Sequence, residues 1–329
     1  MVLLTYGLDA DSQGRKETIM SKNELIWANL IHLSANMWAD REVPEWGRDY
    51  VSAKPYLRFD TDLWRDLVRR MADSGINMVV LDLGDAVRYQ SHPEIALKDA
   101  WSVGHLKEEL ARLREVGIEP IPKLNFSACH DVWLGPYSRM LSTNTYYAVC
   151  RDLIAEAIQI FDKPRFFHLG MDEETAAHQA YYEYAVIRQF DLWWHDFYFL
   201  VEQVEKGGSR AWIWSDYVWE HPDVFWQKMP KSVLQSNWYY GESFGEEIGY
   251  VKAYLDLEAH GYDQIPTGSN DGTPVNFGRT VDFAREHIPP ERLLGFLQTS
   301  WRPTTHQYKD RHIQAIEQVA EAKREFEGK

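Results

Sequence analysis

Short apolar runs alternate along this chain with longer stretches in which apolar residues return every three or four positions. The runs have the length of buried strands, and the stretches have the period of helices that bury one face. The predicted strands span residues 25–33, 77–83, 118–124, 165–171, 211–215, 233–238, 263–267 and 293–298. The predicted helices span residues 61–74, 102–116, 143–161, 176–206, 244–260, 281–287 and 309–326.

This alternation of strands and helices predicts an α/β fold, a (β/α)8 TIM barrel in a single domain. The alternative, an open doubly wound sheet, usually has a Gly-rich phosphate loop after its first strand, and Ser34 to Trp38 contain no glycine. We assign residues 21–329 to the barrel and expect residues 38–56 to form an ordered loop on its active face. We interpret residues 1–20 as an N-terminal extension or vector-derived segment, because Met20 offers a second start.

The chain is acidic, with a formal net charge of −15 over 329 residues. Such a charge repels phosphate backbones and argues against nucleic acid as a partner. No apolar run reaches the roughly 18 residues of a membrane span, and the N-terminus lacks the apolar core of a secretory signal. We therefore expect a cytoplasmic protein without a membrane partner. Cys129 and Cys150 are too few for a disulfide framework or a zinc site, and we expect no cofactor.

In a TIM barrel the carboxyl ends of all strands meet at one rim, where active sites lie. The residues that follow the predicted strands are rich in aromatic and polar side chains. Sugar rings have apolar faces and polar edges, so flat aromatic surfaces and a few hydrogen bonds hold them, although any single tryptophan is equally typical of a core. The predicted carbohydrate-binding residues are Asp85, Asn125, His130, His168, Trp214, Asp216, Trp238, Tyr239 and Trp301.

The most informative segment is residues 165–174, an apolar run that ends in Asp172, Glu173 and Glu174. Paired carboxylates at a strand end are typical of sugar hydrolysis. The alternative is that they cap the next helix, whose N-terminus favours negative charge. Residues 265–271, at the end of the predicted seventh strand, contain no glutamate, which argues against displacement by a second glutamate. Glu173 is then the candidate for the acid that protonates a leaving oxygen.

The same segment resembles the family 20 glycoside hydrolases, the β-N-acetylhexosaminidase group. That family carries His-x-Gly-Gly-Asp-Glu after its fourth strand, and this chain has His168-Leu-Gly-Met-Asp-Glu173. Residues 75–85 look like the family's second strand, and residues 117–122 look like the segment that enters its third strand. His130 roughly matches a histidine that follows. The resemblance covers about residues 60–175.

The resemblance implies a glycosidase that removes a terminal sugar, such as a β-linked N-acetylhexosamine. In that family the substrate's own acetamido oxygen attacks the anomeric carbon, an exception to the standard scheme with two carboxylates. By this resemblance Asp172 orients the acetamido group, Glu173 is the acid/base, and His168 holds the carboxylates or a sugar hydroxyl. Asn125 stands where the family has an acid, and no glutamate follows the predicted eighth strand.

Two other functions fit the same residues. A metal-dependent sugar isomerase or hydrolase would use Asp82, Asp85, His130, His168 and Asp172 around one divalent ion. No compact ligand motif such as His-Glu-x-x-His occurs in the chain. A non-catalytic carbohydrate-binding barrel is the third interpretation, and the intact acid pair argues against it.

Overall fold

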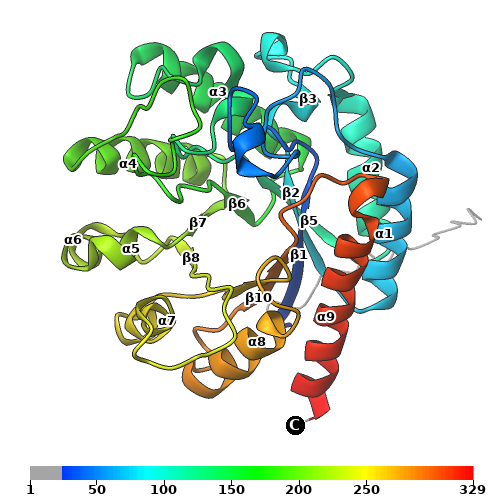
Figure 1. Ribbon diagram of the computed structural model, residues 1–329, viewed down its shortest axis with the longest axis vertical. Helices are drawn as coiled ribbons and strands as arrows, with labels where there is room; N and C mark the ends of the chain where they lie inside the picture. The colour runs from blue at the N-terminus through cyan, green and yellow to red at the C-terminus, as the bar shows by residue number, and fades with distance from the viewer. Residues whose placement is uncertain (1–23, 329) are drawn as a thin grey trace, which may run out of the picture.

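The computed structural model describes residues 24–328 as a barrel of parallel strands surrounded by helices (Figure 1). The barrel strands are β1 (Ile26–His32), β2 (Met78–Asp82), β5 (Glu119–Lys123), β6 (Phe166–His168), β7 (Arg210–Trp214), β8 (Leu234–Ser236), β9 (Thr267–Ser269) and β10 (Gly295–Thr299). The predicted (β/α)8 barrel is therefore confirmed. The extension predicted at residues 1–20 lies outside the described residues.

The strands follow one another around the barrel in the order β8-β7-β6-β5-β2-β1-β10-β9. The ring closes between β8 and β9 through isolated parallel bridges, Gln235 with Gln264 and Trp238 with Thr267. Pro266 lies between these bridges and has no N–H to donate to a ladder. This gap explains why the regular part of β9 begins at Thr267, at the end of the predicted strand at residues 263–267.

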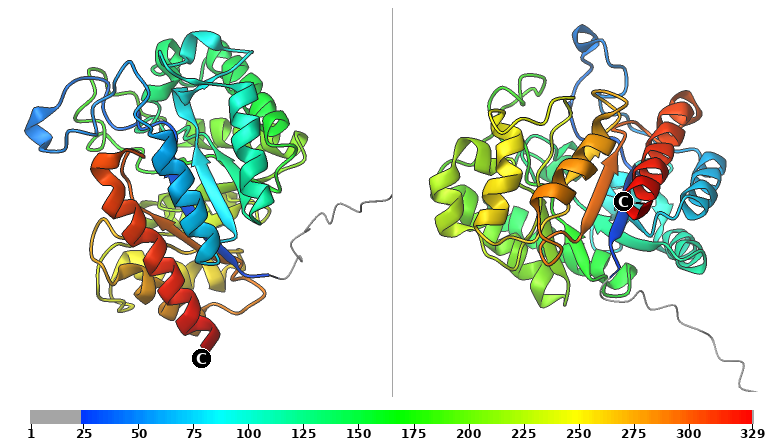
Figure 2. Two further views of the ribbon diagram at one scale, coloured as in Figure 1. Left: turned by 90° about the vertical axis from the view of Figure 1, so that its right-hand side faces the viewer. Right: turned by 90° about the horizontal axis from the view of Figure 1, so that it is seen from below.

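Helices cover the outside of the barrel, and α1 and α9 lie side by side across β1 (Figure 2). The longer helices are α1 (Thr61–Asp73), α2 (Val103–Glu115), α3 (Asn144–Ile160), α4 (Asp191–Lys206), α7 (Gly249–Ala259), α8 (Asn276–His287) and α9 (Lys309–Gly328). The shorter elements are η1 (Pro44–Trp46), η2 (Gly84–Ala86), β3 (Val87–Arg88), η3 (Pro93–Ile95), β4 (Trp101–Ser102), η4 (Val132–Tyr137), α5 (Tyr217–Glu220), α6 (Pro222–Lys228) and η5 (His306–Tyr308). None of the helices within residues 24–328 has both the length and the apolar character of a bilayer span.

The helix predicted at residues 176–206 is wrong over its first half, because α4 begins only at Asp191. Arg188 folds back to form a buried ion pair with Glu174, at 2.5 Å. In a continuous helix these two residues would stand about 21 Å apart along the axis. The side chain of Gln179 also binds both the N–H and the carbonyl of Val186. These contacts turn residues 174–190 into a compact loop.

Two other helix boundaries differ from the prediction, and glycines account for both. The helix α7 begins at Gly249, five residues later than predicted, after a turn at Gly245. The helix α8 begins at Asn276, five residues earlier than predicted, although Gly278 lies inside it. Glycine is the weakest helix former after proline. Gly278 therefore weakens the helical pattern at the start of α8, where tertiary contacts still stabilise the helix, whereas Gly245 interrupts a pattern that looks helical before α7.

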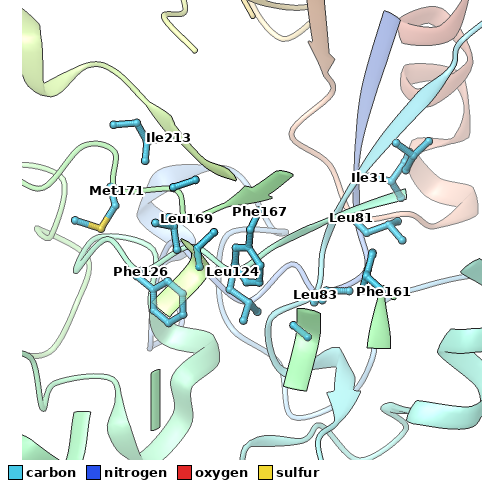
Figure 3. Packing of buried hydrophobic residues seen from close by; sticks show 14 of the residues in the cluster. Ile31, Leu81, Leu83, Leu124, Phe126, Phe161, Phe167, Leu169, Met171 and Ile213 are labelled. Carbon is cyan, nitrogen blue, oxygen red and sulfur yellow. The ribbon is translucent and has the colours of Figure 1, made fainter. Parts of the chain in front are cut away.

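Two apolar clusters hold the barrel, one inside it and one between strands and helices. Alternate residues of each strand point inward, among them Leu30, Val80 and Ile121. Their neighbours Ile31 and Leu81 point outward, where they join the residues drawn in Figure 3. Strands that are buried on both faces read as continuous apolar runs, and this is why the sequence pattern identified them.

The inward positions change from apolar to polar toward the carboxyl end of the strands. Lys123 is fully buried, and its ammonium lies 2.5 Å from the carboxylate of Asp82, with His32 3.3 Å from the same oxygen. Burial alone would raise the pKa of Asp82, but the charge of Lys123 and the contact with His32 outweigh it and lower the pKa. A buried ion pair therefore forms the floor under the open end of the barrel.

Replacing Lys123 by methionine should lower the free energy of unfolding by about 3–5 kcal/mol, because it leaves the Asp82 carboxylate buried without its cation. Urea unfolding at neutral pH measures this change. Lys252→Met is the control, since Lys252 pairs with Asp256 on an exposed face of α7 and should cost about 0.5 kcal/mol or less. The double variant Lys123→Met with Asp82→Asn should recover part of the loss. Equal, small losses for Lys123→Met and Lys252→Met would contradict a stabilising role for the buried pair.

Candidate active site

A cavity of about 410 Å³ opens at the carboxyl ends of the strands. The segments that follow strands β5 to β10 line it with Asn125, Cys129, His130, Asp172, Glu173, Trp214, Trp238, Tyr240, Asp271 and Trp301. Two long loops, residues 37–51 and residues 172–190, add Met37, Trp38, Trp46, Arg48, Tyr50, Val51, Ala177, His178 and Tyr181. The cavity thus has charged groups between aromatic walls.

An unusual backbone presents the acid pair after β6. Gly170, Met171 and Glu173 all have positive φ, at 71°, 72° and 57°. A side chain at Gly170 would lie 2.0 Å from the Asn125 amide oxygen, so only glycine fits there. Left-handed backbone costs other residues roughly 1–2 kcal/mol, and surrounding contacts must hold it. One of them is the hydrogen bond from the Met171 N–H to Asn125 Oδ1, at 3.2 Å.

The carboxylate of Asp172 is buried and hydrogen-bonded on both oxygens. Asn125 Nδ2 donates to Oδ1 at 2.8 Å, and His130 Nε2 lies 3.2 Å from Oδ2. Burial alone would raise the pKa of Asp172, but the positive charge of His130 and these hydrogen bonds outweigh it and hold the pKa below its ordinary value. Asp172 is therefore a negative charge at neutral pH in a place with little water.

His130 joins the two acids. The same Nε2 atom lies 3.2 Å from Glu173 Oε2, so one ring nitrogen faces both carboxylates. Burial lowers the pKa of His130, but Asp172 and Glu173 together raise it to about 10. The imidazole is therefore cationic at neutral pH and offsets part of the negative charge. On its other side Glu173 faces His178, whose Nε2 is 3.6 Å from Oε1.

Asp216, two residues after β7, lies directly behind Glu173. Its Oδ2 accepts a hydrogen bond from the Glu173 N–H at 2.8 Å, and among the described residues its Oδ1 finds no partner. Burial, together with the nearby charge of Asp172, raises the pKa of Asp216 well above its ordinary value. Asp216 thus supports the backbone of Glu173 while favouring its protonated form.

Aromatic rings form walls of the cavity. The rings of Trp214 and Trp301 lie 5.8 Å apart, and Trp238 stacks on Tyr240 at 5.1 Å with an angle of 28°. Trp301 Nε1 donates to the hydroxyl of Tyr240 at 3.0 Å. Flat faces and hydroxyl groups together suit a ligand with apolar faces and polar edges.

Of the eleven residues predicted for the site, seven line the cavity, namely Asn125, His130, Asp172, Glu173, Trp214, Trp238 and Trp301. Tyr239 does not, because it alternates with its neighbours along the strand direction and packs against Phe244 outside the barrel. Asp85 is buried beside Ser34 and Asn36, which bond its two oxygens, and burial raises its pKa to about 7.

His168 is the remaining predicted residue, and it lies beneath the cavity rather than on its surface. Its ring packs between Trp212 and Trp214, and its Nδ1 accepts the Gly170 N–H at 3.0 Å. Burial lowers its pKa well below the ordinary value, so the ring is neutral. His168 therefore supports the turn that carries the acids.

The prediction of site residues omitted Tyr240, Asp271 and most of the two loops. Tyr240 was within reach of sequence reasoning, because residues two apart in a strand share a face and Trp238 had been selected. The loop residues Trp46, Arg48 and Tyr181 carry no such periodicity. Their only signal is the abundance of aromatic residues in the segments around residues 38–56 and 181–184.

The proposed set of metal ligands is not brought together, because Asp82 and Asp85 are bound to other side chains. Among residues 24–328, one group has ligand atoms close enough for a single ion, all within 4.8 Å of one another. It consists of His130, Asp172 and Glu173. An imidazole and two carboxylates suit a divalent transition metal.

No family model matches the sequence, and no curated protein does. Solved structures are similar in fold. A β-N-acetylhexosaminidase from Bacteroides fragilis superimposes with a TM-score of 0.60 at 12% identity, over 89% of this chain and 65% of that one. A family 20 exo-β-N-acetylglucosaminidase from Vibrio harveyi, in complex with N-acetylglucosamine, gives 0.60 at 12%, over 89% and 54%. Dispersin B gives 0.54 at 16%, over 80% and 95%.

This chain spans less than two thirds of the first two of these proteins. Identities of 12% to 16% are too low to transfer an activity, and function must be argued from the site. The likeness concerns the barrel, and it agrees with the resemblance noted around residues 60–175. The described part of the chain has the fold of the catalytic barrel of the family 20 glycoside hydrolases.

Proposed function

We propose that this protein is a glycoside hydrolase that removes a terminal β-linked N-acetylhexosamine by substrate-assisted, retaining catalysis. One observation carries the proposal: Asp172 and Glu173 both lie 3.2 Å from one nitrogen of His130, at the edge of a cavity with aromatic walls. The fold and the names of the similar structures, which include a hexosaminidase and an N-acetylglucosaminidase, support it.

Asp172 orients and stabilises the reacting acetamido group. The carbonyl oxygen of that group forms a bond to the anomeric carbon as the bond to the leaving oxygen breaks, and positive charge develops on the acetamido nitrogen. A buried carboxylate with a lowered pKa stays ionised and stabilises that charge. Asn125 and His130 hold its two oxygens, so the carboxylate is oriented before the substrate arrives.

In the form that binds substrate productively, Glu173 carries a proton, which it donates to the leaving oxygen, and it later removes a proton from the water that opens the cyclic intermediate. Its neighbours are consistent with a proton-transfer role, since His130 contacts one oxygen and His178 faces the other. The sugar ring then lies between Trp214, Trp238 and Trp301, whose faces cover its apolar sides. Tyr240 offers a hydroxyl at the same wall.

A metal-dependent hydrolase or isomerase is the second candidate, favoured by the grouping of His130, Asp172 and Glu173. These residues would hold the ion, which would polarise a sugar oxygen and activate water. In that case His130 would bind as a neutral ring, whereas the two acids beside it favour its charged form. Treatment of the purified enzyme with a chelator separates the candidates, since substrate-assisted hydrolysis is indifferent to it.

Glu173→Gln should lower kcat on aryl β-N-acetylglucosaminides by at least about 100-fold, because it removes the general acid. Folding and sugar binding should be retained, since the amide has the same shape. A panel of aryl glycosides, including β-N-acetylgalactosaminides and plain hexosides, measures the loss. Glu220→Gln, on the exposed face of α5, is the control. A Glu173→Gln enzyme as active as wild type would exclude Glu173 as the acid/base.

Asp172→Asn should reduce kcat/KM more on substrates with a 2-acetamido group than on plain glycosides, because only the former develop positive charge beside this carboxylate. The measurement compares matched 4-nitrophenyl glycosides with and without the acetamido group. We expect a difference of at least about tenfold between the two losses, the scale of one lost charge-assisted interaction. Equal losses on both substrates would argue against participation of the acetamido group.

Asp216→Asn should change the pH dependence of stability. The raised pKa of Asp216 means that the native state keeps its proton to higher pH than the unfolded chain. Its contribution to stability is present below the unfolded pKa of about 4 and is lost as pH rises through the folded pKa. The asparagine variant lacks this loss, so it should gain stability relative to wild type as the pH rises above about 4.5. Parallel stability curves from urea unfolding would contradict a raised pKa.

A further inference from the structure

The two loops above the barrel line the same cavity as the acid pair and the wall of Trp214, Trp238 and Trp301. Trp46 and Arg48 come from the loop of residues 37–51, and His178 and Tyr181 come from the loop between β6 and α4. Figure 2 shows the segment around η1 projecting beyond the body of the molecule. Trp46, Arg48 and Tyr181 have no part in the reaction as derived above.

The position of the loop residues relative to Glu173 identifies the side of the cavity on which the loop residues lie. A general acid must face the oxygen of the leaving group, so the leaving group departs past Glu173. His178 Nε2 is 3.6 Å from Glu173 Oε1, and Tyr181 follows three residues later in the same series of turns. The loop residues therefore border the space that the leaving group occupies.

A rigid aromatic surface exists there. Trp46 stacks on Tyr181 with ring centres 4.5 Å apart and an angle of 18°, so each ring restrains the other. Beneath them the loop has its own small core of Ala39, Val43, Tyr50 and Val51. Rings that are held before binding lose little conformational entropy when a ligand stacks on them.

One cation is available beside this surface. Arg48 is exposed, lies 6.0 Å from the Trp46 ring, and within residues 24–328 forms no ion pair. The other charged groups nearby are occupied. Arg41 pairs with Glu45 at 3.1 Å, and the lining carboxylate of Asp271 pairs with Arg302 at 2.6 Å.

The acidic character of the chain makes Arg48 important for the binding of an anionic ligand. A net charge of −15 repels anionic ligands at long range, and the base of the cavity carries Asp172 and Glu173. An anionic group on a ligand would find its favourable contact at Arg48, away from those carboxylates.

We propose, resting on the proposed glycosidase function, that Trp46, Tyr181 and Arg48 form a leaving-group subsite for a flat ring that carries an anionic substituent. The ring is a second sugar or an aryl group, and the substituent is a carboxylate or a sulfate. The ring lies against an open face of the stack that Trp46 and Tyr181 form, and Arg48 donates hydrogen bonds to the anion.

Two thioglycosides of N-acetylglucosamine test the subsite by binding alone. One carries a 4-carboxyphenyl group and the other a 4-carbamoylphenyl group, so they match in shape and differ in charge. Titration calorimetry with the whole protein should give a Kd roughly threefold to fivefold lower for the carboxylate, the scale of a partly exposed ion pair. The preference should shrink at high salt.

Arg48→Gln should bring the ratio of the two Kd values close to one. Arg41→Gln is the matched control, since Arg41 lies in the same loop but does not line the cavity, and it should keep the ratio. Trp46→Ala should weaken both glycosides alike. Equal affinities in the wild type, or a preference that survives Arg48→Gln, would overturn the inference.

Free N-acetylglucosamine separates this inference from the proposed function, because it occupies the sugar subsite alone. Binding of the free sugar without a preference for the carboxylate overturns only the leaving-group subsite. If neither the free sugar nor the glycosides bind, the proposed hexosaminidase function fails and the inference fails with it.

Discussion

The site depends on keeping the carboxylate of Asp172 ionised where water is nearly absent. A lone buried carboxylate would take up a proton rather than pay several kcal/mol of desolvation. His130 supplies the opposite charge and Asn125 the second hydrogen bond. Both contacts require the chain to turn sharply after β6, which explains why the strained backbone at Gly170 and Met171 is present.

The ionised carboxylate of Asp172 also interacts electrostatically with the charged groups around it. Burial raises the pKa of Asp216, and repulsion from the ionised Asp172 in the same low-dielectric space raises it further. From below, the ammonium of Lys123 lowers the pKa of Asp172, although it is bonded to Asp82. The floor of the barrel and the acid pair are thus electrostatically connected, so a change at Lys123 alters both stability and the pKa of Asp172.

The barrel was predictable from sequence, because strands buried on both faces must be continuous apolar runs, and a helical period follows each predicted strand except the one at residues 211–215. The acid pair was predictable because it ends such a run. The loop at residues 174–190 was not, since its composition looks helical and only the distant pairing of Glu174 with Arg188 folds it back. The loop at residues 38–56 was predicted on the active face, but the choice of Trp46 and Arg48 among its side chains was not, because loops lack a period that relates one residue to another.

The acid pair lies at a strand end, whereas Trp46 and Arg48 lie in a loop. This difference helps to explain how the protein keeps a shared fold at only 12% to 16% sequence identity to the similar structures. Groups that transfer protons must be positioned closely. Here the acid pair follows the end of β6, and buried partners such as Asn125 hold it in place. The residues of the proposed leaving-group subsite instead rest on the core of Ala39, Val43, Tyr50 and Val51 in their own loop. In the proposed glycosidase, substitutions in that core would change what the leaving-group subsite accepts. Reaction and specificity can therefore diverge separately on one barrel.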